Sequence, residues 1–186
     1  VAFLGLIESS YSQIPVRYIR ASDLAKRWDE GMPLGNGLMG ALVWNKNERI
    51  RFALDHAELW DERPMKDLHG PHFSYQWVEE NWKAGTYKKV QEALDHPYDR
   101  EPAPTKIPGA AIELPLSLVG SNPEVILDLF TASVLIKGKN GVDIMSFVDA
   151  NQNKGWIKVS NLSSPFSADL IIPPYQNKIV SVGDVV

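Results

Sequence analysis

Short runs of apolar or alternating residues, separated by turn residues, dominate the second half of this chain. The runs cover residues 111–116, 124–130, 131–137, 142–148, 156–161 and 167–172. Turn residues separate them, and Asn140-Gly141 is a strong hairpin signal. Strands at this spacing are typical of antiparallel sandwiches. The pattern therefore predicts a mainly β fold.

A glycine-rich loop followed by a hairpin organises the first half. Gly35, Asn36 and Gly37 form a G-N-G turn, and these residue types reach positive φ at little steric cost. Residues 38–44 are apolar, residues 45–47 are turn residues, and residues 48–54 alternate polar and apolar positions. This pattern predicts a hairpin with one solvent-exposed face.

The remaining first-half segments predict one strand and two helices. Residues 15–20 alternate weakly, and residues 21–26 suit a helical turn capped by Ser22. Residues 74–84 and 86–94 carry apolar positions at helical spacing. Residues 95–107 hold three prolines, so we expect neither helix nor central strand there.

The two ends of the chain suggest a partial domain. Residues 1–7 are apolar, and Ser10 and Ser12 follow them as a small-x-small pair, as at the end of a secretory signal peptide. An edge strand is the alternative. We expect residues 1–12 to be a signal remnant, residues 13–186 to be one sandwich domain that is incomplete at its C-terminal end, and the protein to be periplasmic or secreted.

Composition narrows the classes of partner. The chain has 19 basic and 23 acidic residues, a net charge of −4, and no cysteine. With this nearly balanced, slightly negative charge, the chain has no positive electrostatic potential that would attract nucleic acid or an anionic membrane. No segment approaches the length of continuous apolar sequence that a membrane span needs. Disulfides and thiolate metal sites are excluded. The six tryptophans suit either a core or stacking on sugar rings.

The loop and hairpin carry a family resemblance. Residues 28–60 read WDEGMPLGNGLMGALVWNKNERIRFALDHAELW. This run resembles the N-terminal β-sandwich domain of glycoside hydrolase family 95, the α-L-fucosidases, which is related to the family 65 N-terminal domain. Residues 127–132, L-D-L-F-T-A, are similar to a strand signature of the family. Where the family usually has N-E-x-x-L-W, this chain has D-H-A-E-L-W, which indicates a divergent branch.

The resemblance implies a super-sandwich fold that packs on a catalytic (α/α)6 barrel of the same polypeptide. It places the G-N-G loop at the seam with that barrel, near the rim of the active-site pocket. The candidates for the rim or the domain interface are Gly35, Asn36, Gly37, Trp60 and Asp61. A purely structural turn, and packing of Trp60 at the seam, remain alternatives.

Catalytic residues are not expected in this chain. Glycoside hydrolysis needs two carboxyl groups that flank the scissile bond. The pairs Asp29-Glu30 and Asp61-Glu62 are adjacent in sequence, so their side chains point apart. His69 and His72 have metal-ligand spacing, but Pro71 prevents a helix from aligning them and no third ligand is evident. We expect neither a metal nor a cofactor.

The expected function is therefore that of a non-catalytic domain. The longer protein would be a secreted hydrolase that cleaves terminal α-L-fucosyl or related bonds of an oligosaccharide. The family resemblance implies that the reaction inverts the configuration at the anomeric carbon. The alternative is a stand-alone carbohydrate-binding sandwich, which a coplanar exposed row of Trp77, Trp82 and Trp156 would favour. A family 65-type phosphorylase is a third possibility, because it shares the sandwich-plus-barrel plan.

Overall fold

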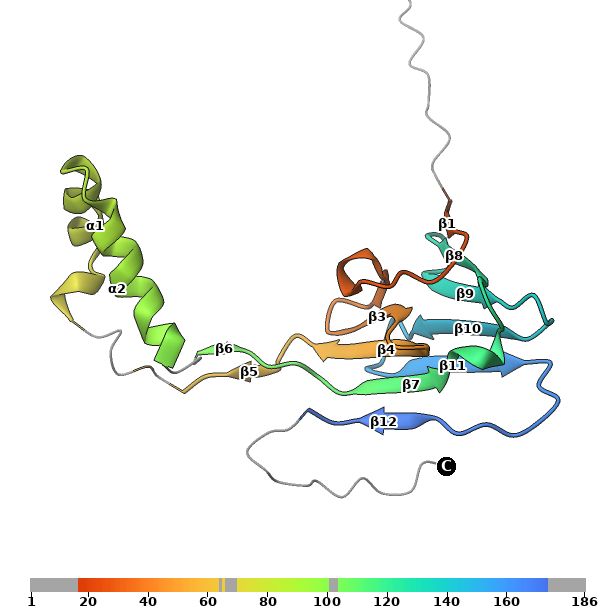
Figure 1. Ribbon diagram of the computed structural model, residues 1–186. Helices are drawn as coiled ribbons and strands as arrows, with labels where there is room; N and C mark the ends of the chain where they lie inside the picture. Colours follow the sequence, from red (N-terminus) through yellow and green to blue (C-terminus); the bar gives the residue numbers. More distant parts are fainter. Residues whose placement is uncertain (1–16, 64, 66–69, 101–103, 174–186) are drawn as a thin grey trace, which may run out of the picture.

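The computed structural model describes residues 17–63, 65, 70–100 and 104–173. Two five-stranded antiparallel sheets form the body of the molecule, with two helices on one side (Figure 1). The predicted mainly β sandwich with two inserted helices is confirmed. The expected signal remnant at residues 1–12 lies outside the described residues.

The first sheet has the strand order β1-β8-β9-β10-β11. Its strands are β1 (Tyr18–Ala21), β8 (Glu124–Asp128), β9 (Ser133–Lys137), β10 (Asp143–Val148) and β11 (Gly155–Ser160). All neighbours pair antiparallel, so the chain forms a meander from β8 to β11, and β1 adds to its edge by pairing with β8.

The second sheet has the order β12-β7-β4-β3-β2. Its strands are β2 (Met32–Gly35), β3 (Met39–Asn45), β4 (Arg49–His56), β7 (Ala111–Pro115) and β12 (Asp169–Ile171). The predicted hairpin is β3 and β4, and Asn47 and Glu48 in its turn both have positive φ. On one face of this sheet Arg51 Nη1 donates to Glu113 Oε1.

The core lies between the two sheets. Val43, Ile50 and Phe52 from the second sheet and Ile136 and Ile144 from the first are at most 1% exposed. Alternation along each strand directs these side chains to the same interior, as expected of a sandwich with one wet face on each sheet.

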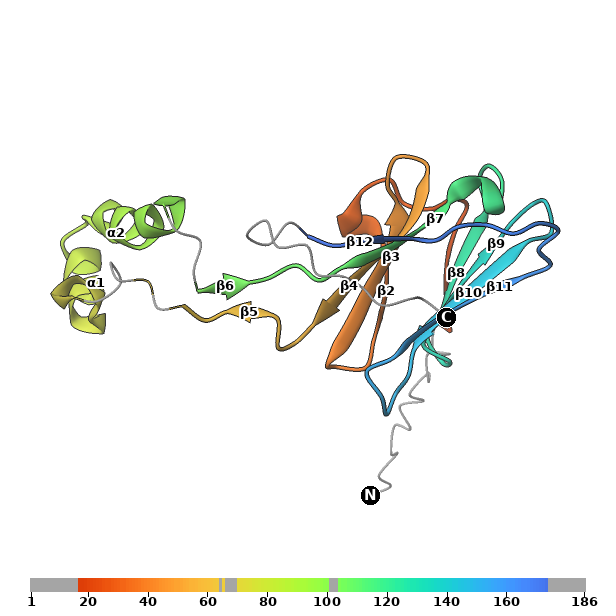
Figure 2. The same cartoon turned by 90° about the horizontal axis from the view of Figure 1, so that it is seen from below.

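The sheets are close on one side and separated on the other. They approach each other where β2 and β3 contact β10, at the ends that carry the β2–β3 and β10–β11 turns (Figure 2). On the side of β11 and β12 the inner faces form a trough of about 470 Å³. We call it the apolar trough; its apolar lining residues are Ile112, Leu114, Ile157, Val159, Phe166, Ala168 and Leu170.

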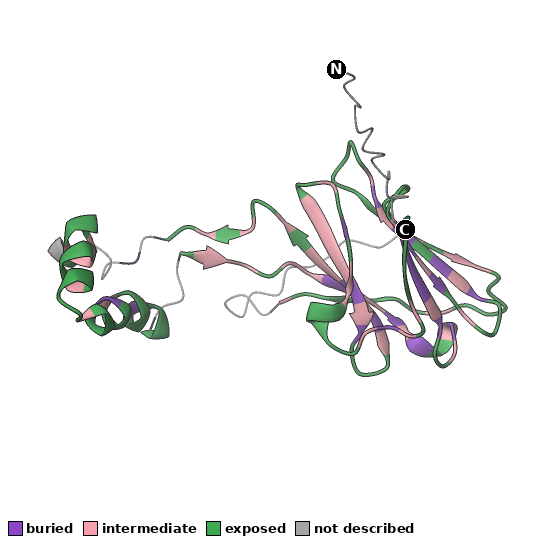
Figure 3. Ribbon diagram, turned by 90° about the horizontal axis from the view of Figure 1, so that it is seen from above, coloured by how far each residue is buried: buried purple, intermediate pink, exposed green. Residues whose placement is uncertain are grey.

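A two-stranded ribbon leads from the second sheet to the helices. Its strands are β5 (Trp60–Asp61) and β6 (Thr105–Lys106), and the helices are α1 (Tyr75–Lys83) and α2 (Tyr87–Arg100). Figures 1 and 3 show this helical arm standing away from the sheets, with most of its surface exposed. Among the described residues, no helix is both long and apolar enough to cross a membrane.

The predicted boundaries of the arm are partly wrong. The two predicted helices form, with the Ser74 hydroxyl accepting a hydrogen bond from Trp77 N at the start of α1 and Gly85 at positive φ after its end. The expectation that no helix extends past residue 94 fails, because α2 continues to Arg100 with Pro97 inside it. Pro97 has no N–H to donate to the carbonyl of Ala93, so α2 lacks one backbone hydrogen bond there, and its side chain is buried.

Two further local expectations are corrected. Residues 21–26 form no helical turn, because Leu24 is drawn into the core and Ala25 O accepts from Asn45 N; a short 3₁₀ helix, Trp28–Glu30, follows instead. The strands expected at 124–130 and 131–137 are shortened by a turn between Asp128 and Ser133. The Asp128 carboxylate accepts from Phe130 N and Thr131 N, which closes this turn.

Candidate functional site

The β2–β3 turn is attached to the other sheet through Asn36. Its Nδ2 donates to Asp149 O (2.9 Å) and Gln152 O (3.1 Å) in the β10–β11 turn. Its Oδ1 accepts from Leu38 N (3.0 Å) and Met39 N (2.8 Å). The amide therefore uses two donors and two acceptor positions within the chain.

The glycines on either side of Asn36 serve different purposes. A Cβ on Gly35 would lie 3.1 Å from Met39 O, so the backbone passes closely there. Gly37 has φ of +94° and open space beside it. Gly37 is thus required by backbone conformation, and Gly35 by close strand approach.

A pocket of about 430 Å³ opens beside this turn. It lies between the β2–β3 turn, the end of β4 and the β5–β6 ribbon. We call it the rim pocket; its lining residues are Gly35, Gly37, Leu38, Met39, Gly40, Asp55, His56, Ala57, Trp60 and Lys106. Three of the five residues predicted from the sequence therefore line one hollow, namely Gly35, Gly37 and Trp60.

Lys106 connects the charged and aromatic sides of the rim pocket. Its Nζ lies 3.0 Å from Asp55 Oδ1 and 5.8 Å from the centroid of the Trp60 ring, and it donates to His56 O. Trp60 pairs with Lys106 in the ribbon, and its indole Nε1 donates to Ala57 O (2.9 Å). The Trp60 side chain is 51% exposed, so its ring is held in place and still open to solvent.

His56 faces the β10–β11 turn. Its Nδ1 accepts from Glu58 N at 3.3 Å. Nε2 lies 3.1 Å from Asn153 Nδ2, and the tautomer of the histidine decides which of these two nitrogens donates. The histidine thereby links the rim pocket to the same turn that Asn36 contacts.

Asp61 lies in β5 and does not line the rim pocket. Its carboxylate accepts from the Arg63 guanidinium, at 2.6 Å from Nη2, and from Arg63 N. These side-chain and backbone hydrogen bonds from Arg63 hold the pKa of Asp61 below its usual range. The structure therefore gives Asp61 a local partner away from the pocket.

Among the described residues, the rim pocket offers groups for binding and has no pair of carboxyl groups. Asp55 is the one carboxylate among its lining residues, and it is paired with Lys106. Hydrolysis by two flanking carboxyl groups therefore has no counterpart there. An exposed indole beside a lysine, a histidine and a carboxylate is suited to contact with a polyhydroxylated ring.

No group of three or more potential metal ligands occurs within the described part of the chain. Of the two histidines with metal-ligand spacing, His69 lies outside the described residues. His72 packs its ring against Trp77, with centroids 5.6 Å apart.

The exposed tryptophans lie on separate parts of the molecule. Trp82 on α1 meets Tyr87 edge to face, with ring centroids 5.7 Å apart. Trp156 on β11 stacks on Phe147, with centroids 6.5 Å apart. Trp77 is half-buried. The coplanar row that would favour a stand-alone binding module is not formed by these three side chains.

Lys106 and Asp55 belong to the site, but the sequence pattern did not indicate them. Lys106 lies 46 positions after Trp60 in the chain, and the β5–β6 pairing brings the two together. A two-residue strand leaves no periodic signal, so the sequence pattern did not indicate this pairing.

Residues 19–97 match the family described as glycosyl hydrolase family 65, N-terminal domain. The match covers β1 to β5, α1 and most of α2, and includes every lining residue of the rim pocket except Lys106. It supports a glycoside hydrolase N-terminal β-sandwich domain. No curated protein matches the chain.

Proposed function

We propose that this chain is the non-catalytic N-terminal sandwich of a secreted glycoside hydrolase that acts on terminal α-L-fucosyl or related bonds. It packs on a catalytic (α/α)6 barrel of the same polypeptide and contributes the rim pocket to the edge of the active site. The observation that carries this proposal is the match of residues 19–97 to a glycoside hydrolase N-terminal domain.

Two features of the structure support a non-catalytic role for this chain beside a separate catalytic barrel. In the described part of the chain, the rim pocket has an exposed indole and a paired lysine and aspartate but no pair of facing carboxyl groups, so it suits contact with substrate and not bond cleavage. In the apolar trough, Phe166 and Ile157 are only partly buried. Because contiguous exposed apolar surface usually marks an interaction site, the trough supports packing of this domain on a further domain.

The first experiment measures where the activity resides. The full reading frame is expressed and assayed on aryl α-L-fucosides and aryl galactosides, and the 186-residue chain is assayed in parallel. We expect turnover only by the full protein, with the released sugar inverted at the anomeric carbon as judged by NMR. Turnover by the 186-residue chain alone would contradict the proposal.

A family 65-type phosphorylase is the second candidate, because the domain matched by residues 19–97 is described as belonging to family 65. The same assay with and without inorganic phosphate separates the two reactions. Hydrolysis proceeds equally in both buffers, whereas a phosphorylase needs phosphate and releases a sugar phosphate. Phosphate-dependent turnover would replace the hydrolase proposal with the phosphorylase.

The role of the rim pocket is tested in the full protein by Trp60→Ala. Loss of one aromatic stacking contact costs about 0.5–1.5 kcal/mol, which raises KM roughly twofold to tenfold while kcat is kept. Trp28→Ala is the matched control, because Trp28 is 66% exposed and does not line the pocket. Equal KM values for the two variants would remove Trp60 from the substrate rim.

A further inference from the structure

A second hollow of about 600 Å³ lies at the opposite end of the sandwich from the rim pocket. It is lined by residues from the end of β1, the start of β8 and the β9–β10 turn. We call it the basic pocket; its lining residues are Arg20, Ala21, Ser22, Asn122, Glu124, Lys137, Gly138 and Lys139. β10 starts beside this pocket at Asp143 and ends near the turn that Asn36 contacts.

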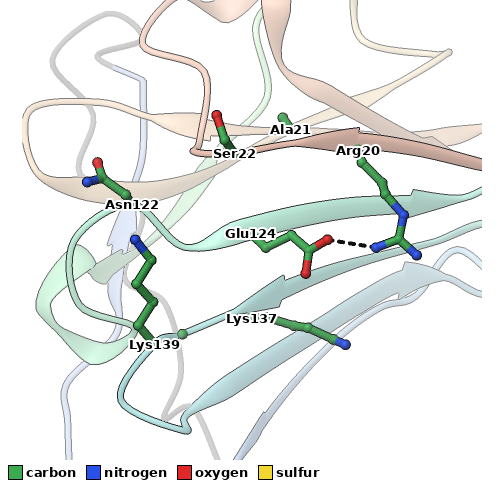
Figure 4. A pocket seen from close by; sticks show the side chains of 8 residues that line it. Arg20, Ala21, Ser22, Asn122, Glu124, Lys137 and Lys139 are labelled. Carbon is green, nitrogen blue, oxygen red and sulfur yellow. Dashed lines mark hydrogen bonds and ion pairs between the residues drawn. The ribbon is translucent and has the colours of Figure 1, made fainter.

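Three cations and one acid line the basic pocket, in a chain whose net charge is −4. Arg20 Nη1 donates to Glu124 Oε1 at 2.7 Å (Figure 4). The guanidinium carbon also lies 5.3 Å from the centroid of the Tyr18 ring, which orients it. Because a guanidinium has five N–H donors, most of them remain available to a ligand.

The two lysines are not neutralised by an ion pair. Within the described residues, Lys137 and Lys139 form no salt bridge, and the side chains of Ser22 and Asn122 form no hydrogen bond. Lys137 lies in register between Glu124 on β8 and Asp143 on β10. In Figure 4 Lys139 extends towards Asn122, while Arg20 and Lys137 lie on either side of Glu124.

The floor of the basic pocket is fixed backbone. A Cβ on Gly138 would lie 2.5 Å from Val142 O and 2.7 Å from Val119 O, so the turn is packed directly on its neighbours. Asn140 Nδ2 donates to Leu118 O (2.8 Å), which ties the turn to the segment before β8. The turn that carries Lys139 is therefore held in place before any ligand binds, so binding does not have to order its backbone.

We propose that the basic pocket binds an anionic sugar unit, through the carboxylate of a uronate or the sulfate of a sulfated sugar. Arg20, Lys137 and Lys139 hold the anion, and Ser22, Asn122 and Glu124 contact hydroxyl groups. The sugar part of this inference rests on the proposed function, whereas the anion part rests on the charges alone. The three cations surround one open hollow and do not follow a stripe, so their arrangement does not match the repeated phosphates of nucleic acid.

The test uses calorimetric titration of the 186-residue chain with four ligands. These are an oligogalacturonate, its methyl-esterified neutral form, a sulfated oligosaccharide and inorganic sulfate. We expect the oligogalacturonate or the sulfated oligosaccharide to bind, the neutral form to bind at least tenfold more weakly, and binding to weaken as salt is raised. Which of the two binds more tightly identifies the anion.

Two double variants with the same charge change locate the site. K137Q/K139Q removes two pocket cations, and we expect it to weaken binding roughly fivefold to tenfold, as for two exposed ion pairs. K46Q/K158Q is the matched control, because Lys46 and Lys158 are exposed and lie outside the pocket. Equal weakening by both double variants would overturn the proposal, because the anionic oligosaccharide would then respond to the total charge of the protein and not to the lysines of the basic pocket.

Three other results also overturn it. These are no binding of either anionic oligosaccharide, equal binding of the neutral form, and binding of inorganic sulfate as tight as that of the sugars, which removes the sugar assignment. None of these depends on turnover. Failure of the glycosidase assay is therefore a separate result from failure of this proposal.

Discussion

Asn36 shows how a single residue of the G-N-G motif works in the folded chain. Its side-chain amide makes four hydrogen bonds, two within its own turn and two to the β10–β11 turn of the other sheet. An amide that is fully engaged in this way has little capacity left for a sugar hydroxyl. The residue thus positions the wall of the rim pocket, and Trp60 presents the exposed surface.

Replacing Asn36 with alanine removes all four bonds and leaves carbonyl groups at the sheet junction without a partner. We expect Asn36→Ala to lower the free energy of unfolding by about 1–3 kcal/mol, measured by urea denaturation. Asn151→Ala is the control, because its side chain forms no hydrogen bond to another described residue; we expect a change below about 0.5 kcal/mol. Equal losses in both variants would show that Asn36 does not join the sheets.

Asp128 makes the turn after β8 sensitive to acid. Burial raises the pKa of this carboxyl, but hydrogen bonds from Phe130 N, Arg17 and Thr131 outweigh that effect, so the net pKa lies below its usual value. A lowered folded-state pKa gives stability that is present above about pH 4 and is lost as the pH falls through the folded-state pKa.

The corresponding prediction compares wild type with Asp128→Asn across pH. The variant lacks the charge and the ion pair with Arg17, so it should be less stable at pH 7. The difference between the two melting temperatures should shrink as the pH falls below about 4. A difference that stays constant down to pH 2 would assign the stabilisation to something other than the ionised carboxylate.

At the scale of elements, strand pairing decides which segments become neighbours. The backbone just before β7 lies very close to that of β4, where Leu54 N donates to Ala110 O at 2.8 Å. A Cβ on Gly109 would lie 2.2 Å from Leu54 O, which is backbone and has no room to move. The glycine just before β7 is therefore required by the approach of two strands far apart in sequence.

Gly109→Ala tests this close approach. Overpacking against backbone typically costs about 1–3 kcal/mol, and we expect a loss of that size in the free energy of unfolding by urea. Gly70→Ala serves for comparison, because a Cβ there meets nothing within 4 Å. If Gly109→Ala proves as stable as Gly70→Ala, β7 does not lie against β4 as described.

At the scale of the whole molecule, the sandwich and the helical arm have separate interiors. Phe52 is 1% exposed between the sheets, whereas Val90 is fully buried within the arm. The two helices contact each other and the short 3₁₀ helix before α1, Pro71–Phe73, more than they contact either sheet. A two-helix unit with so few buried side chains is expected to open independently.

Hydrogen exchange should distinguish the two units. Val90→Ala removes two buried methyl groups, worth about 1–2 kcal/mol, and should reduce amide protection in residues 75–100 alone. Phe52→Ala should lower the global free energy of unfolding by about 3–5 kcal/mol and reduce protection throughout both sheets. Loss of protection in β4 and β10 on Val90→Ala would show that the arm and the sandwich unfold together.

The sequence by itself determined the features that depend on neighbours in the chain. Alternation, turn residues and helical spacing located most strands, the β3–β4 hairpin and the two helices, because these signals act within a few residues. The extent of α2 past Pro97 and the turn at 129–132 were missed, since tertiary burial and one carboxylate overrode the local pattern.

Only the tertiary structure decided which distant residues meet. The G-N-G motif indicated one wall of the rim pocket, but Lys106 reached Trp60 and Asp55 through a strand pair without a periodic signal. Arg20, Glu124 and Lys137 meet because β1 pairs with β8 and β8 with β9. Local propensity fixes where strands form, whereas the order and register of strands depend on burying both sheets at once, and that is a property of the complete fold.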